Sequence, residues 1–339
     1  MAADQVLSIE IVTADGRFVT ADAENNPDIF WAVRGGGGST YGVVTSMVLK
    51  AYPKITVTTM MYNMSTDAKF TNAQFWTAQR AWFDNFATFA DKGFYAYGRI
   101  RHVGATTVTN YTWVAPNVTE QEFRAIVAPL FEKWAKLGMP FNPVIRQYDN
   151  YHDAWEAGFP LEGWSIGMRQ ASRLIPRENL VDESKKNATI EAIESVFNDG
   201  ANLILFNMRN PPGSEKIDNA VNPPWRKVVM FALMFVNWNT NDSPEFATSI
   251  SRNLTYEWNP RWRAVTPGGG TYMSESDYIE PDRPQSFHGD KYSRLYQIKQ
   301  KWDPDGVFYA QNAVGSEDWQ MSGVLMGHLP SQNSRLCRK

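Results

Sequence analysis

The segment Asp28-Ile-Phe-Trp-Ala-Val-Arg34-Gly-Gly-Gly-Gly-Ser-Thr-Tyr-Gly-Val-Val-Thr45 is the most informative stretch of this 339-residue chain. Four consecutive glycines join a short apolar helix to a β-branched strand. Glycines let backbone N–H groups approach an anion closely, which suggests a phosphate-binding loop. However, no G-x-G-x-x-G trio or G-K-[ST] ending is present, and the loop leads into a strand. Taken alone, the loop is therefore predicted to be structural.

Composition and charge limit the possible partners. Hydrophobic residues make up 43% of the chain, which is enough to build a large folded core. The net charge is only −3 and no long Lys/Arg block occurs, so we expect no nucleic-acid partner. No apolar stretch approaches the roughly 18 residues that span a bilayer, so we expect no membrane partner either.

Cysteine and histidine patterns argue against a metal site. Cys337 is the sole cysteine, so an internal disulfide and a cysteine-based zinc site are excluded. The four histidines show no H-E-x-x-H or similar ligand spacing. We therefore predict no bound metal.

Hydrophobic periodicity predicts an α+β fold. A hairpin that turns at Asp15-Gly16 precedes the glycine segment, and strands then alternate with amphipathic helices. Two α/β halves on one antiparallel sheet account for this order. Strands are expected at 55–63, 94–100, 107–114, 201–207 and 228–237, and helices at 73–89, 120–137, 188–197, 244–256 and 291–301.

Two segments carry a resemblance to a known family. The glycine segment and the hairpin before it resemble part of the flavin domain of FAD-linked oxidases with the vanillyl-alcohol-oxidase fold, the PCMH type. Roughly 250 residues later, Phe287-His-Gly-Asp-Lys-Tyr-Ser-Arg-Leu295 and Lys301-Trp-Asp-Pro-Asp-Gly-Val-Phe308 resemble the C-terminal berberine-bridge-enzyme motif. Ala313-Val-Gly-Ser-Glu-Asp-Trp319 extends it in the fungal style.

The resemblance implies three parts. Residues 1–53 are expected to be a remnant of the FAD-binding domain, and residues 54–266 a substrate domain whose antiparallel sheet is covered by helices. Residues 267–339 are expected to return to the flavin domain. Family members carry further residues before the position of Met1, including the pyrophosphate loops and the attachment His and Cys, so the chain is expected to be N-terminally truncated.

The resemblance also implies chemistry: FAD as cofactor, hydride transfer from a small-molecule substrate to flavin N5, and molecular oxygen as acceptor. Such a reaction needs a positioned base. Tyr272, Glu275 and His288 are the catalytic candidates, although Tyr272 and Glu275 also fit a strand tyrosine and an exposed loop acid. The residues expected at the cofactor are Arg34, Gly36, Gly37, Gly38, Thr40, Tyr41, Gly42, Val44, Lys291, Tyr292 and Asn312. Val44 also fits a plain core position.

Two positions depart from the family pattern. His288 stands where related sequences commonly carry Tyr or Trp, and Lys291 replaces an Asn expected near the flavin. These changes either retune the site or mark its decay. A flavin-free remnant that acts as a binding module, or that complements a chain supplying the missing half of the flavin domain, is therefore the main alternative. An unrelated carbohydrate-binding protein is a third reading.

Substrate and location are less defined by the sequence. Oligosaccharides and fungal secondary metabolites remain equally open as substrates. Met1-Ala-Ala-Asp lacks the features of a signal peptide. A secreted glycoprotein is nevertheless expected, because six Asn-X-Ser/Thr sequons occur, at Asn63, Asn110, Asn117, Asn187, Asn241 and Asn253.

Overall fold

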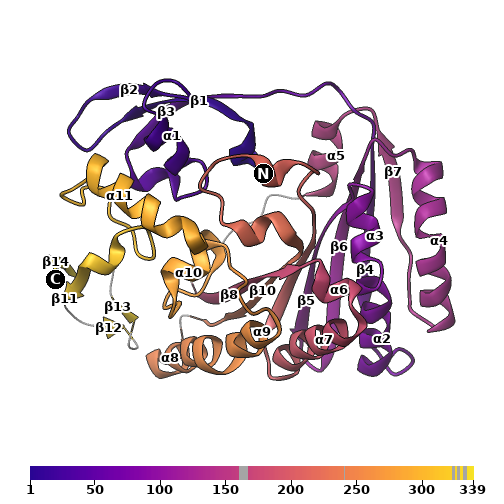
Figure 1. The fold of residues 1–339 in the computed structure, drawn as a ribbon. Helices are drawn as coiled ribbons and strands as arrows, with labels where there is room; N and C mark the ends of the chain where they lie inside the picture. Colours follow the sequence, from indigo (N-terminus) through magenta and orange to yellow (C-terminus); the bar gives the residue numbers. More distant parts are fainter. Residues whose placement is uncertain (160–166, 240, 323–324, 327–328, 331–333) are drawn as a thin grey trace.

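Two sheets organise the molecule (Figure 1). The computed structural model describes residues 1–159, 167–239, 241–322, 325–326, 329–330 and 334–339. The smaller sheet has the order β2-β1-β3 and the larger has the order β7-β4-β6-β5-β9-β10-β8. The smaller sheet consists of β1 (Val6–Val12), β2 (Phe18–Ala21) and β3 (Val43–Leu49).

Every neighbouring pair in the seven-stranded sheet is antiparallel. The first four strands of the order come from the first half of the substrate region and the last three from its second half. The two halves meet where β5 pairs with β9, as in Gly98↔Leu205. The strands are β4 (Val57–Ser65), β5 (Tyr95–Val103), β6 (Thr106–Pro116), β7 (Val144–Tyr148), β8 (Met168–Pro176), β9 (Asn202–Asn207) and β10 (Val228–Asn237).

Helices cover one face of this sheet and build the main core with it. The core is rich in large aromatic side chains, among them Trp82, Trp113 and Trp134, all fully buried. On the opposite face α5 (Tyr151–Gly158) packs beside β4 and β6. The covering helices are α2 (Asn72–Phe83), α3 (Phe86–Asp91), α4 (Glu120–Lys136), α6 (Glu178–Val181), α7 (Glu183–Asn198), α8 (Pro244–Arg252) and α9 (Asn259–Val265).

The predicted α+β fold with an antiparallel, helix-covered sheet is confirmed, with two local corrections. The helix expected at 73–89 is broken into α2 and α3 at Asp84 and Asn85. The helix expected at 244–256 ends as α8 at Arg252, continues as the π-helical segment η5 (Asn253–Trp258), and runs on as α9. The division at residues 53 and 266 stays a prediction.

The chain's two recognised segments dock on each other beside the smaller sheet. Helix α1 (Pro27–Val33) packs near α11 (Tyr292–Trp302), which follows α10 (Arg283–His288). The Tyr41 hydroxyl donates to the Leu295 carbonyl at 3.3 Å. The buried Lys299 ammonium donates to the carbonyls of Thr40 at 2.6 Å and Phe308 at 2.9 Å and pairs with Asp303. These contacts fix the glycine segment against α11.

The C-terminal residues form two short antiparallel pairs. Strand β11 (Trp319–Ser322) pairs with β14 (Arg335–Arg338), and β12 (Leu325–Met326) pairs with β13 (Leu329–Pro330). Among the described residues, no helix is long and apolar enough to cross a membrane.

Candidate functional site

A cavity of about 290 Å³ lies where the glycine segment meets the C-terminal motif. Its wall is built from four stretches that are distant in sequence: the N-terminus, the glycine segment, the loop before β10, and the region that leads into α10. The predicted residues in this wall are Gly37, Gly38, Tyr272 and His288, and the others include Gly35, Asn222, Trp225, Thr271 and Met273.

His288 is the most unusual side chain of the wall. The residue is only 2% exposed, and neither ring nitrogen has a hydrogen-bond partner within the described residues. Burial lowers the pKa of its imidazole from 6.5 to about 4. At neutral pH the ring is therefore uncharged, with one nitrogen available to donate and the other to accept a hydrogen bond.

Asn222 supplies a second unpartnered group. Its side-chain nitrogen donates to the Ser286 carbonyl at 2.9 Å. Because a carbonyl can only accept, this bond fixes which end of the amide is the nitrogen. The amide oxygen of the buried Asn222 then has no partner in the described part of the chain. Buried polar atoms are normally paired, so these atoms of His288 and Asn222 need a further partner, which a water or a ligand supplies.

Glu275 lies outside the cavity wall, on the short 3-10 turn η6 (Met273–Glu275). Burial raises the pKa of its carboxyl. The carboxylate also lies close enough to Tyr95 on β5 to contribute, after burial and two neighbouring tyrosines, to the raised pKa of the Tyr95 hydroxyl. Glu275 therefore faces the large sheet and is a proton acceptor with raised basicity.

A strip of aromatic rings connects the cavity with the open face of the large sheet. In the cavity wall, the Tyr272 ring lies 5.6 Å from that of Trp225. It also lies 6.2 Å from the ring of Phe231. Phe231 is 5.2 Å from Phe206, which is 5.0 Å from Tyr97 on β5. Tyr272 is 40% exposed, whereas Trp225 and Phe231 are buried, so the strip links the cavity wall to the large sheet through packed rings.

Three residues expected at the cofactor, Arg34, Lys291 and Tyr292, do not line this cavity and have other contacts, so their roles stay predictions. The Arg34 guanidinium stacks over the Phe30 ring at 4.0 Å and donates to the Asp218 carbonyl at 3.1 Å. The Lys291 ammonium donates to the Asn219 carbonyl. The Tyr292 hydroxyl donates to Glu317 and accepts from the Gly315 amide.

The remaining expected cofactor residues have structural contacts. Thr40 caps its own turn through Gly37, and Tyr41 is fully buried against α11. A side chain at Gly42 would meet the Val12 carbonyl oxygen at 2.6 Å, and one at Gly36 would meet Leu295 Cδ2 at 2.3 Å. Val44 packs against the core of the smaller sheet, and Asn312 donates to the Asp277 carbonyl at 3.2 Å. Their roles at a cofactor stay predictions.

Sequence reasoning missed Asn222 and Trp225. Both lie in the segment Asn222-Pro-Pro-Trp225, which matches no binding motif. The two prolines would have predicted a rigid turn, but nothing in the sequence places that turn against His288. A larger cavity of about 590 Å³ holds none of the predicted site residues, and two of the arginines in its wall, Arg177 and Arg209, are already paired with Asp91. The smaller cavity is therefore the better candidate.

Comparisons with known proteins indicate the family. Residues 234–315 match the family model described as "Berberine and berberine like". The chain is 33% identical over 343 residues to the FAD-linked oxidoreductase patO of Aspergillus clavatus, a match that covers 100% of this chain and 57% of patO. It is 30% identical over 349 residues to the VAO-type flavoprotein oxidase VAO615 of Thermothelomyces thermophilus, again covering 100% and 57%.

A solved structure shares the fold. The VAO-type flavoprotein MtVAO615 from Myceliophthora thermophila C1 superposes with a TM-score of 0.84 at 28% identity, covering 100% of this chain and 60% of that one. The chain thus spans a little over half the length of the curated relatives that it matches. The chain therefore contains the berberine and berberine-like family domain at residues 234–315, and along its whole length it is similar to fungal FAD-linked oxidoreductases with the fold of VAO-type flavoproteins.

Proposed function

We propose that this chain forms part of an FAD-dependent oxidase, which removes a hydride from a carbon of an alcohol, sugar or secondary metabolite and uses molecular oxygen as electron acceptor. The observation that carries the proposal is the 290 Å³ cavity between the glycine segment and the C-terminal motif. Its wall contains the unpartnered polar atoms of His288 and Asn222.

The cavity fits the ring end of a flavin. Ligand pockets usually measure about 300–1,000 Å³, so 290 Å³ suits one ring system and is too small for a whole dinucleotide. Gly37 and Gly38 keep one side of the wall open, since a side chain at Gly37 would already meet Met273 Cε at 3.2 Å. The carbonyl and N–H groups of such a ring are proposed to pair with the buried, unpaired atoms of His288 and Asn222. Residues outside this cavity would have to hold the nucleotide.

FAD, when bound, supplies the hydride acceptor at N5 and the route of electrons to oxygen. The chain's own task is to bind the substrate and move its proton. Glu275 is proposed as the base that takes the proton of the substrate hydroxyl, because burial raises its pKa toward working pH. The uncharged His288 is proposed to hold a polar ring group, and Tyr272 to orient the substrate against the aromatic strip.

Flavin content and turnover test the proposal together. The purified chain, loaded with FAD, is expected to show the visible absorbance of a bound flavin and to produce hydrogen peroxide from a panel of alcohols and oligosaccharides. Glu275→Gln is expected to lower kcat by roughly 100-fold or more, the usual contribution of a general base. Glu132→Gln, on the exposed side of α4, is the matched control and should leave kcat unchanged. Absence of flavin at saturating FAD would contradict the proposal.

One observation favours the alternative, in which the chain is a flavin-free module that complements another chain. The outer edge of β3 has no strand partner in the described residues, and β3 exposes Val43, Met47, Val48 and Leu49 by half or more. Exposed apolar edge strands are sites of pairing with another segment. Mixing the chain with a purified N-terminal flavin-domain fragment of a relative distinguishes the readings: flavin binding only in the mixture supports complementation.

We also propose that the protein is secreted and glycosylated. Asn117, Asn187, Asn241 and Asn253 are exposed, and Asn63 and Asn110 lie directly opposite each other on β4 and β6. Expression through a secretory pathway should therefore give glycans at the first four positions and at no more than one of the opposed pair. Peptide mapping after enzymatic deglycosylation measures this, and unmodified asparagine throughout would contradict the proposal.

A further inference from the structure

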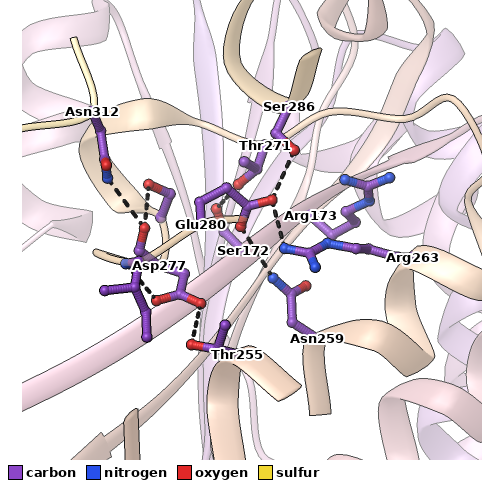
Figure 2. Close-up of polar contacts among 12 residues, drawn as sticks. Ser172, Arg173, Thr255, Asn259, Arg263, Thr271, Asp277, Glu280, Ser286 and Asn312 are labelled. Carbon is purple, nitrogen blue, oxygen red and sulfur yellow. Dashed lines mark hydrogen bonds and ion pairs between the residues drawn. The ribbon is translucent and has the colours of Figure 1, made fainter. Parts of the chain in front are cut away.

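The turn that carries Glu275 is held at both ends by hydrogen bonds. At its start, the Gly270 carbonyl accepts from the Leu174 amide at 2.9 Å, and the hydroxyls of Thr271 and Ser172 lie 2.5 Å apart. The segment thereby extends along strand β8 before it turns away. Asp277 holds the other end, two residues after Glu275 (Figure 2).

Asp277 collects contacts from three places in the chain. Its Oδ2 lies 2.6 Å from the Thr255 hydroxyl, and its Oδ1 accepts from the Ile279 amide at 3.0 Å. Its main-chain carbonyl accepts from the Asn312 side-chain amide at 3.2 Å, which Figure 2 also shows. The residue is 4% exposed, so water does not replace these partners.

Two irregular backbone features bring those partners to Asp277. Thr255 lies in the π-helical segment η5, a widened stretch that interrupts the helical run between α8 and α9. Asn312 has a left-handed backbone with φ of 69°, which is unfavourable for residues other than glycine. Such deviations persist when the surrounding structure holds them in place, and they are frequent at functional sites. Here both deviations place a polar side chain on Asp277, Thr255 at its carboxyl group and Asn312 at its main-chain carbonyl.

The hydrogen bonds of the Thr255 hydroxyl indicate the protonation state of the Asp277 carboxyl group. The hydroxyl has one proton and two acceptors within reach, Asp277 Oδ2 and the Ser251 carbonyl at 2.9 Å. Both contacts are satisfied at once when Asp277 is protonated, because the acid then donates to the hydroxyl and the hydroxyl donates to Ser251. Burial raises the pKa of Asp277, in agreement with that arrangement.

Asp277 is not required as the partner of a buried cation. The adjacent guanidinium of Arg263 pairs with Glu280 at 2.6 Å, and Glu280 also accepts from Ser286 at 2.7 Å (Figure 2). A buried acid without its own cation is a poor source of stability, but hydrogen-bonded polar networks fix geometry. The structure therefore points to a positional role.

We propose that Asp277 is a positioning residue, which uses the side chains of Thr255 and Asn312 to fix the turn that presents Glu275 to the substrate. This inference rests on the proposed role of Glu275 as the base. It adds three residues that do not touch the reacting atoms but set where the base stands.

Titration of Glu275 tests the proposal without any flavin. In the full chain labelled with ¹³C at glutamate carboxyls, the Glu275 signal is assigned as the one lost in Glu275→Gln. Thr255→Val removes the hydroxyl but keeps the side-chain shape, so the turn should loosen, Glu275 should become hydrated, and its pKa should fall by roughly one pH unit. Asn312→Gly, which suits a positive φ, should act in the same direction.

Matched variants make the result decisive. Thr248→Val removes a buried hydroxyl that donates to the Pro244 carbonyl within α8 and not to Asp277, and should leave the titration of Glu275 unchanged. Asp277→Asn keeps a donor toward Thr255 and an acceptor for Ile279, and should also preserve it. Equal Glu275 titration in Thr255→Val, Asn312→Gly and the unaltered chain would overturn the proposal. A chain that binds no flavin would contradict the oxidase function but leave this titration readable.

Discussion

The polar network around Asp277 and the wall of the 290 Å³ cavity are neighbours in the fold. They differ in how many of their buried polar atoms have hydrogen-bond partners. In the network, each of the four carboxyl oxygens of Asp277 and Glu280 has at least one partner, and only the amide oxygen of Asn259, which donates to Glu280 through its nitrogen, has none among the described residues. In the wall, both nitrogens of His288 and the amide oxygen of Asn222 have none among the described residues. Saturated polar groups fix a shape, whereas buried unpaired groups reduce stability unless a ligand satisfies them.

The largest expected effect comes from breaking the ion pair of this network. Arg263→Met removes the cation that pairs with the buried Glu280 at 2.6 Å. A buried carboxylate without its partner costs about 3 kcal/mol of unfolding free energy, measured by urea denaturation. Arg261→Met, which breaks the more exposed pair with Asp199, should cost less than about 1 kcal/mol. If both variants lose the same unfolding free energy, the buried ion pair of the network contributes no more to stability than an exposed one.

The next prediction concerns pH and His288. Its folded pKa of about 4 lies below the unfolded value of 6.5, so protons bind the unfolded state more tightly. Its contribution to stability is complete above pH 6.5 and is lost as the pH falls toward 4, by at most about 3 kcal/mol. Glu275 and Asp277 have raised pKa values and contribute with the opposite sign, since their stabilisation is lost as the pH rises.

A comparison with His288→Phe separates these contributions. The variant lacks the imidazole, so the difference in unfolding free energy between it and the unaltered chain should change between pH 7 and pH 4.5. At pH 7 the phenylalanine variant should be the more stable of the two in the absence of flavin, because two unpaired nitrogens are gone. His102→Phe removes a ring nitrogen that contacts the Phe197 carbonyl at 2.9 Å and should give no such gain. If the difference in unfolding free energy between the unaltered chain and His288→Phe does not change with pH, His288 is not a buried, neutral residue.

The sequence predicted the fold more completely than the site. Runs of β-branched and alternating apolar residues located five of the seven strands of the large sheet, β4, β5, β6, β9 and β10, but not β7 or β8. Periodicity missed the break at Asp84 and Asn85, since apolar residues continue through both α2 and α3 and the periodic signal does not stop. It also missed the π-helical segment, whose buried Thr255 contacts Asp277 more than twenty residues later.

The site was predictable only where a motif marked it. Gly37 and His288 lie in the two recognised segments, and the structure places both in one cavity wall. Asn222 had no such signal, because an asparagine in a proline-rich loop is ordinary until its amide is seen to be half paired. The pairing state of a buried polar atom is a property of tertiary packing. No local pattern of residues contains it.

The smallest expected effect tests the difference between paired and unpaired atoms on two tyrosines. The Tyr41 hydroxyl donates to the Leu295 carbonyl, whereas the equally buried hydroxyl of Tyr62 has no partner in the described residues. Tyr41→Phe should therefore cost about 1 kcal/mol of unfolding free energy, and Tyr62→Phe should be neutral or slightly stabilising. Thermal and urea unfolding of both variants measure this. If both substitutions lower the unfolding free energy equally, hydrogen-bond pairing does not determine what these buried hydroxyls contribute to stability. The unpaired atoms of His288 and Asn222 would then be no evidence for a ligand site.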